Sequence, residues 1–189
     1  MSCIVFFLAN FQCFAQENTN DKQHLLAMYG IKTGFGVLGQ QLSEGGTYRP
    51  ILFLVHFELN FIKKPSNETG LLFRWYLEPQ VNPVFLREKL SEYEFGVNAG
   101  LRLDYLFPGG WGIYAVAGVG PHYISVETER QAKGFIFSDN GGIGLYKNIF
   151  GKWNITAECR VRHISNANLQ SPNDGINNLF PVVGISKSL

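Results

Sequence analysis

The residues best suited to chemistry lie in two neighbouring runs, His163-Ile164-Ser165-Asn166-Ala167 and Pro172-Asn173-Asp174-Gly175. His163 and Ser165 are two positions apart at the end of a strand-like segment, so both side chains lie on one face of that strand. A histidine that takes the proton of a serine hydroxyl is the minimum arrangement for acyl transfer. The pair therefore predicts an esterase or an acyltransferase, and the alternative is an inert polar pair at the end of a strand.

Alternation of apolar and polar side chains dominates the chain that must position this pair. In the segment 93–105, every second residue is apolar or aromatic, and those between are polar or glycine. Several such segments reach the length of about 9–11 residues that a strand needs to cross a bilayer. We predict eight strands, near residues 27–39, 50–62, 70–80, 92–106, 111–125, 134–148, 152–165 and 179–188.

The connections between these strands alternate in length. Those near 63–69, 107–110 and 149–151 are short, and those near 40–49, 81–91, 126–133 and 166–178 are longer and more polar. Bacterial outer-membrane barrels combine an even number of strands with short periplasmic turns and long outer loops. We therefore predict an all-β fold, an eight-stranded antiparallel transmembrane β-barrel. A β-sandwich that buries the aromatic face in its core is the alternative.

The polar faces of the predicted strands carry as many basic as acidic side chains. Eight strands enclose an interior that side chains fill, and buried charges require partners. The sequence thus predicts a core of ion pairs and no open pore. The ten predicted interior charges are Lys32, Arg74, Arg102, Arg160, Arg162, Glu58, Glu78, Glu94, Asp104 and Glu158.

Length, charge and cysteine content narrow the class of protein further. The chain has 189 residues, enough for one domain, and its 16 Lys and Arg against 15 Asp and Glu argue against a nucleic-acid partner. Residues 1–15 are apolar with small residues near their end, which is typical of a secretory signal peptide. We expect the barrel to occupy residues 16–189. Cys3 and Cys13 would leave with the signal, and the remaining Cys159 cannot form an intramolecular disulfide.

The parity of the strand at 152–165 places the candidate pair on the outer face of the barrel. Glu158, Arg160 and Arg162 face inward, so His163 and Ser165 fall on the lipid side near the outer rim. A polar pair on that surface is costly unless it has a use. A substrate that is itself a lipid of the outer leaflet would supply that use.

The stretch 161–177 resembles the outer-membrane lipid A 3-O-deacylases, in which a His-x-Ser-Asn-Ala run carries the base and the nucleophile. The resemblance implies that His163 is the general base and Ser165 the nucleophile. It associates Asn166 and Asn173 with the oxyanion hole, whose donors stabilise a tetrahedral intermediate. It also implies removal of the ester-linked acyl chain at the 3-position of lipid A in the bacterial outer membrane, with no metal and no cofactor.

One position departs from the family pattern, because the acid that orients the histidine falls at Asn177 by spacing. An amide can hold a histidine tautomer but stabilises an imidazolium less than a carboxylate does. Asp174 in the preceding loop is the alternative orienting acid.

Several functions stay open at this point. Beside the lipid A deacylase stand a phospholipase or acyltransferase on the same scaffold and a non-catalytic structural or adhesive barrel. The expected partners are lipid A or lipopolysaccharide in the outer leaflet and the membrane itself, with no nucleic acid. The sequence leaves open whether the chain forms a homodimer.

Overall fold

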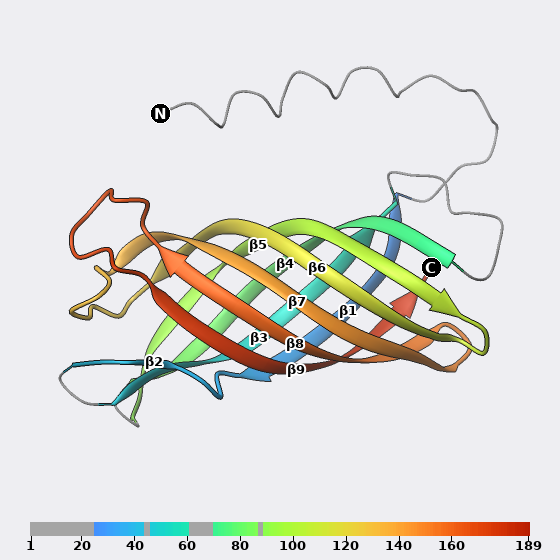
Figure 1. Ribbon diagram of the computed structural model, residues 1–189, viewed down its shortest axis with the longest axis horizontal. Coiled ribbons are helices and arrows are strands. Elements are labelled where there is room, and N and C mark those ends of the chain that lie inside the picture. The colour runs from blue at the N-terminus through green and yellow to red at the C-terminus, as the bar shows by residue number, and fades with distance from the viewer. Residues whose placement is uncertain (1–24, 44–45, 61–69, 87–88) are drawn as a thin grey trace, which may run out of the picture.

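The computed structural model describes residues 25–43, 46–60, 70–86 and 89–189, and the expected signal peptide lies outside these ranges. All strands belong to one antiparallel sheet that closes into a barrel (Figure 1). The described residues contain no helix that is long and apolar enough to cross a membrane. The strands are β1 (Leu26–Phe35), β2 (Gln40–Gln41), β3 (Thr47–Leu59), β4 (Gly70–Leu86), β5 (Lys89–Phe107), β6 (Trp111–Ile124), β7 (Gly134–Phe150), β8 (Trp153–Ser165) and β9 (Ile176–Ser188).

Closure depends on β1, which pairs with β9 on one side and with β3 on the other. The short β2 pairs with β3 outside this ring of eight long strands. The eight-stranded barrel predicted from alternation is thereby confirmed, and the sandwich alternative is wrong.

The predicted long connection at 81–91 is wrong, because the two flanking strands continue through most of it. β4 runs on to Leu86 and β5 begins at Lys89. Inward- and outward-facing side chains still alternate in this part of β4. The inward-facing Asn82 is polar, and its amide donates to Glu94 Oε1 at 2.8 Å. The strand predicted from residue 179 likewise starts earlier, at Ile176.

The barrel has two unlike ends (Figure 1). The β5–β6 and β7–β8 turns and the C-terminus lie at one end, here called the turn end. The opposite loop end carries β2 and the long β6–β7 and β8–β9 connections. Because outer-membrane barrels place short turns in the periplasm, the loop end is the one expected to face outward.

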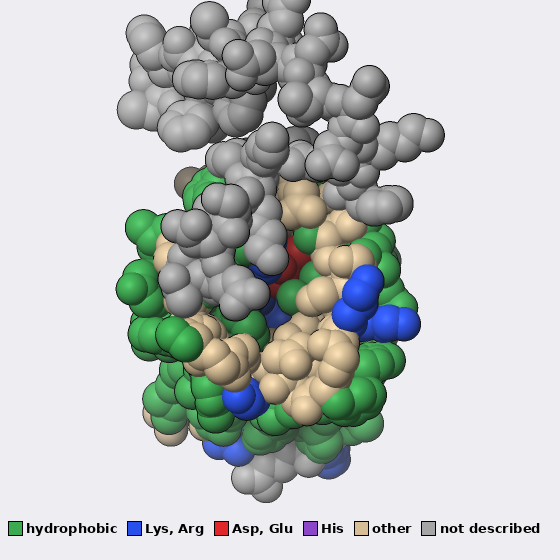
Figure 2. All heavy atoms as spheres, turned by 90° about the vertical axis from the view of Figure 1, so that its right-hand side faces the viewer, with side chains coloured by type: hydrophobic (Ala, Val, Ile, Leu, Met, Phe, Trp, Pro, Cys, Tyr) green, Lys and Arg blue, Asp and Glu red, His purple; other side chains and the backbone are tan. Residues whose placement is uncertain are grey.

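All ten charges predicted for the interior enter ion pairs there. Glu78 has three partners: it accepts from Arg160 Nη1 at 2.6 Å and Lys32 Nζ at 3.2 Å, and it contacts His56 Nδ1 at 2.8 Å. Viewed from the turn end, acidic and basic atoms appear in the central opening, with hydrophobic side chains around the periphery (Figure 2). Pairing offsets the desolvation that isolated buried charges would suffer.

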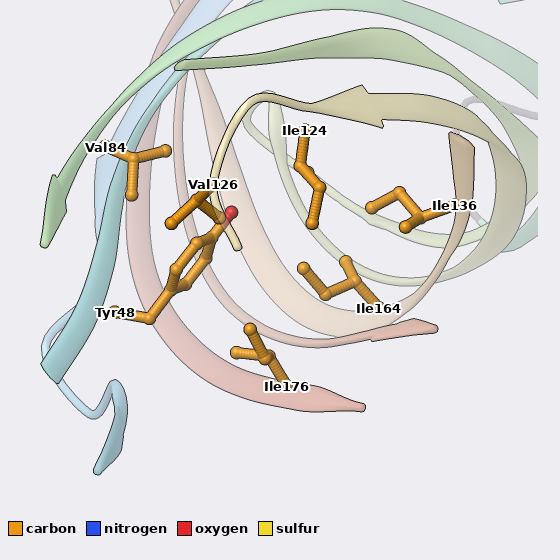
Figure 3. Packing of buried hydrophobic residues seen from close by; sticks show 7 residues of the cluster. All are labelled: Tyr48, Val84, Ile124, Val126, Ile136, Ile164 and Ile176. Atoms are coloured by element: carbon orange, nitrogen blue, oxygen red, sulfur yellow. The ribbon is translucent and has the colours of Figure 1, made fainter. Parts of the chain in front are cut away.

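An apolar cluster fills the barrel interior toward the loop end. Its side chains come from six strands and the β6–β7 connection and point toward one another (Figure 3). Burial of each aliphatic side chain contributes about 1.5–3 kcal/mol. The inward direction of Ile164 and Ile176 sets the outward direction of the residues beside them. The cluster consists of Tyr48, Val84, Ile124, Val126, Ile136, Ile164 and Ile176.

The outer wall exposes large apolar side chains that a water-soluble protein would bury. Ile143 is 69% exposed and Ile31 is 61% exposed. Paired aromatic rings lie toward both ends of this wall: Phe95 and Tyr123 stack at 5.3 Å near the loop end, and Tyr105 and Phe107 meet edge to face at 4.9 Å near the turn end. An apolar band between two aromatic girdles is the outer surface of a membrane barrel.

Candidate functional site

Strand β8 presents His163 and Ser165 on the outer wall, as its parity predicts. Ile164 between them is completely buried in the apolar cluster, whereas the two flanking side chains are half-buried and directed outward. A one-residue shift of the strand would exchange these faces. Packing of Ile164 inside the barrel therefore holds the pair on the lipid side.

His163 is oriented by Asn177, its Cα partner on β9. The two side chains form a hydrogen bond of 2.9 Å between Nδ1 and Oδ1. With the amide oxygen as acceptor, the ring hydrogen sits on Nδ1, and Nε2 is the basic nitrogen. Asp174 is exposed, and no hydrogen bond within the described ranges joins its side chain to His163. Geometry thus favours Asn177 over Asp174 as the orienting residue.

Ser165 lies two positions from His163 on the same face of β8. Both residues are described, and no hydrogen bond is formed between them. Such bonds are often long in unliganded hydrolases and tighten once substrate is bound. The arrangement supplies a hydroxyl and an oriented base on one face of β8.

The β8–β9 connection brings Asn166 and Asn173 together. The backbone N–H of Asn166 donates to Asn173 Oδ1 at 2.6 Å, and Asn173 Nδ2 donates to Asn168 Oδ1 at 2.9 Å. Ala167 and Asn168 have φ values of 53° and 63°. Left-handed backbone at residues other than glycine costs of order 1 kcal/mol or more and collects at functional sites. The asparagine bonds hold this strained turn directly after Ser165.

The β6–β7 connection braces that turn from the side. Gln131 and Asn173 form an isolated β-bridge. The Asp174 N–H donates to the Arg130 carbonyl at 2.7 Å, and Arg130 Nε donates to the Gly175 carbonyl at 3.3 Å. Both connections lie at the loop end (Figure 1). Two segments distant in sequence therefore fix the backbone that covers His163.

Gly175 lies directly against the His163 ring. Its φ is +74°, and a Cβ at this position would come within 2.3 Å of His163 Cε1 and 2.8 Å of Nε2. Real Cβ atoms do not approach so closely. A glycine is therefore needed here both for its backbone conformation and for the space that the imidazole occupies.

A row of polar residues crosses the outer wall at the level of His163. Asp139 on β7, His163 on β8 and Asn177 on β9 are successive Cα partners. All three line a surface groove of about 1010 Å³. The groove continues over the outer wall along apolar side chains and small residues. Its floor and walls include Trp75, Leu101, Ala117, Gly141, Val161 and Leu179.

The part of the chain that the structure describes contains no group of three or more His, Cys, Asp or Glu side chains arranged to hold a metal ion. Cys159 is an exposed free thiol on the outer wall.

Sequence reasoning named Gly175 only as part of the loop run 172–175, and it did not single out Arg130 or Asp139. The first two act through contacts between distant loops, which carry no periodic signal. Asp139 did carry one, because it is an acid on the outward face of β7, between the outward-facing Phe137 and Gly141.

Comparisons with known proteins agree with the fold. Residues 51–186 match the family described as PagL, lipid A 3-O-deacylase. The crystal structure of the outer membrane enzyme PagL is similar with a TM-score of 0.53 and 17% identity over 82% of this chain and 97% of that one.

A second solved structure, that of Neisserial surface protein A (NspA), is similar with a TM-score of 0.56 and 11% identity over 87% of this chain and 95% of that one. At these identities the two structures bear on the fold alone. No curated protein sequence matches the chain significantly. Through the family match, which spans most of its length, the chain belongs to the lipid A 3-O-deacylase (PagL) family of bacterial outer-membrane β-barrels.

Proposed function

We propose that this chain is a serine esterase that removes the ester-linked 3-position acyl chain from lipid A in the outer leaflet. The observation that carries the proposal is the oriented imidazole of His163, bonded to Asn177 at 2.9 Å, on the same lipid-facing side of β8 as Ser165. Family membership supplies the substrate class. The outward direction of the pair agrees with a substrate that never leaves the membrane.

The reaction begins when Ser165 Oγ attacks the ester carbonyl carbon and His163 Nε2 takes the hydroxyl proton. As the tetrahedral intermediate collapses, the ester C–O bond breaks, and His163 returns the proton to the departing sugar oxygen. A water molecule, deprotonated by the same nitrogen, then attacks the acyl-enzyme. The fatty acid leaves, and Ser165 regains its proton.

Asn166 and Asn173 take part by shaping the oxyanion hole. Their mutual hydrogen bond of 2.6 Å fixes the turn that follows the nucleophile. Preorganised donors at such a turn stabilise the negative oxygen of the intermediate without reorganising during the reaction. The groove beside His163 is the binding site for the apolar part of the acyl chain, since it runs from the polar row onto the lipid-facing wall.

Replacing Asn177 by glutamate is expected to raise the deacylation rate about tenfold. A carboxylate at this position would stabilise the imidazolium that forms during attack, which an amide does only weakly. The initial rate of acyl release from lipopolysaccharide in detergent micelles measures the effect. Asn177→Gln, which has the length of glutamate without its charge, is the control and should show no gain. Equal rates for both variants would contradict the assigned role.

Replacing Gly175 by alanine is expected to lower the same rate about 100-fold, because the new methyl group displaces the His163 ring by an ångström or more. Gly109→Ala is the matched control: its φ is +79°, close to that of Gly175, but no heavy atom lies within 4 Å of the added methyl group. Both variants bear similar backbone strain, so a comparable loss of rate in both would argue against a contact with the base.

The proposed function is tested by mass spectrometry of lipid A from Gram-negative cells with and without this chain in the outer membrane. Loss of one hydroxyacyl chain supports the proposal. Intact lipid A together with accumulating lysophospholipid would identify a phospholipase, and lipid A with an added chain an acyltransferase. No lipid change with a folded barrel in the outer membrane would indicate a non-catalytic protein.

A further inference from the structure

Asp139 is a carboxylate on the outer wall, at the β7 end of the polar row that it forms with His163 and Asn177. It is exposed, and its cross-strand neighbours are Val119 on β6 and His163 on β8. Along β7, the next outward positions are Phe137 and Gly141, of which only Phe137 carries a side chain. A charged group on the lipid-facing side destabilises a barrel. Within the described ranges, Asp139 forms no salt bridge with a lysine or arginine.

The placement of Asp139 relative to the base is specific. Directly opposed residues on antiparallel strands have Cβ atoms about 4.5–5.5 Å apart. His163 is therefore flanked on one side by the amide of Asn177 and on the other by the carboxylate of Asp139, and all three line the same groove. The amide holds the ring hydrogen but brings no charge. The carboxylate brings a charge but forms no hydrogen bond to the ring.

We propose that Asp139 is a positioning residue for the reaction, supplying from β7 the negative charge that Asn177 on β9 lacks. The orienting and charge-stabilising tasks, which one acid performs in a serine–histidine–acid triad, are divided here between two residues. Lipid over the groove lowers the local dielectric and strengthens the attraction between Asp139 and the imidazolium that forms on attack. The inference rests on the proposed function, because it assigns a partner to the same base.

The proposal is tested with an alkyl fluorophosphonate, a probe that reacts with Ser165. The probe contains no sugar and no acyl hydroxyl. Ser165 Oγ forms a bond to phosphorus, the P–F bond breaks, fluoride leaves, and the hydroxyl proton goes to His163. The maximal labelling rate and the half-saturating probe concentration are measured separately on the full barrel in micelles. Labelling of Ser165 is located by peptide mass spectrometry.

Asp139→Asn is expected to lower the maximal labelling rate about fivefold, as a cross-strand charge pair worth about 1 kcal/mol implies, with the half-saturating concentration unchanged. In an Asn177→Glu background, which already has a carboxylate beside the ring, the same change should lower the rate less than twofold. Asp139→Glu should restore the rate. Glu127→Gln, which removes an exposed acid of the β6–β7 connection, is the control and should have no effect.

Three results would overturn the inference. Equal losses in both backgrounds would show that Asp139 does not substitute for a missing acid. Normal labelling combined with reduced acyl release from lipid A would place Asp139 on the substrate and not on the base. Labelling of wild type at a residue other than Ser165, or none, would remove the proposed function together with this inference.

Discussion

Cells that carry the Ser165→Ala variant should retain lipid A with its full set of acyl chains, while cells with the unaltered chain lose one. Without the hydroxyl no acyl-enzyme forms, and removal of a serine nucleophile lowers turnover on the order of 10⁴-fold or more. Mass spectrometry of lipid A from cells with matched protein levels measures the difference. His163→Ala should have an effect of the same order, because the two residues act as one unit.

The folding of the barrel should not be affected by the Ser165→Ala change. The side chain is half-buried on the outer wall, and its hydroxyl forms no hydrogen bond with His163. Heat-modifiable migration on gels should therefore be the same for variant and wild type. Ser171→Ala, at an exposed position in the same connection, is the control and should deacylate normally. Continued loss of the acyl chain with Ser165→Ala would exclude this residue as the nucleophile.

Replacing Glu78 by glutamine should produce the largest loss of stability, about 3–5 kcal/mol in the free energy of unfolding. The change leaves the buried Arg160 and Lys32 with Glu158 as their remaining shared acid. Their charges stay inside the barrel with less compensation, and the partner of His56 at 2.8 Å is no longer a charged carboxylate. Urea-induced unfolding of the refolded barrel, followed by the gel shift, measures the loss.

Glu127→Gln provides the comparison for Glu78. Its salt bridge to Lys133 is 3.5 Å long, and both side chains are about 60% exposed. Surface pairs of this kind contribute about 0–1 kcal/mol, so this variant should unfold almost as the wild type does. If both glutamine variants unfolded at the same urea concentration, the interior ion pairs would not be what stabilises the barrel.

Periodicity made most of this architecture predictable. Every strand of a closed barrel has one face toward lipid and one toward the interior, so the period of two appears in residues as distant as Glu58 and Arg160. The same parity placed His163 and Ser165 on the lipid side. Periodicity predicted β4 and β5 too short, because polar residues such as Asn82 continue the inward face beyond the apolar stretch.

Contacts between connections could not be predicted in this way. The bond from Arg130 to the Gly175 carbonyl joins residues 45 positions apart in segments without alternation. The closeness of Gly175 to the His163 ring depends on that brace and on a left-handed φ, which sequence spacing does not encode. The choice between Asn177 and Asp174 needed the register of β8 against β9.

The groove on the outer wall has a consequence for how this protein meets its substrate. A molecule that enters it travels sideways through the leaflet, so encounter is governed by two-dimensional diffusion and not by collision from water. The concentration that matters is then the mole fraction of substrate among its neighbouring lipids. Inert lipid or detergent should slow the reaction because it dilutes the substrate within the surface, even when the total amount of substrate is unchanged.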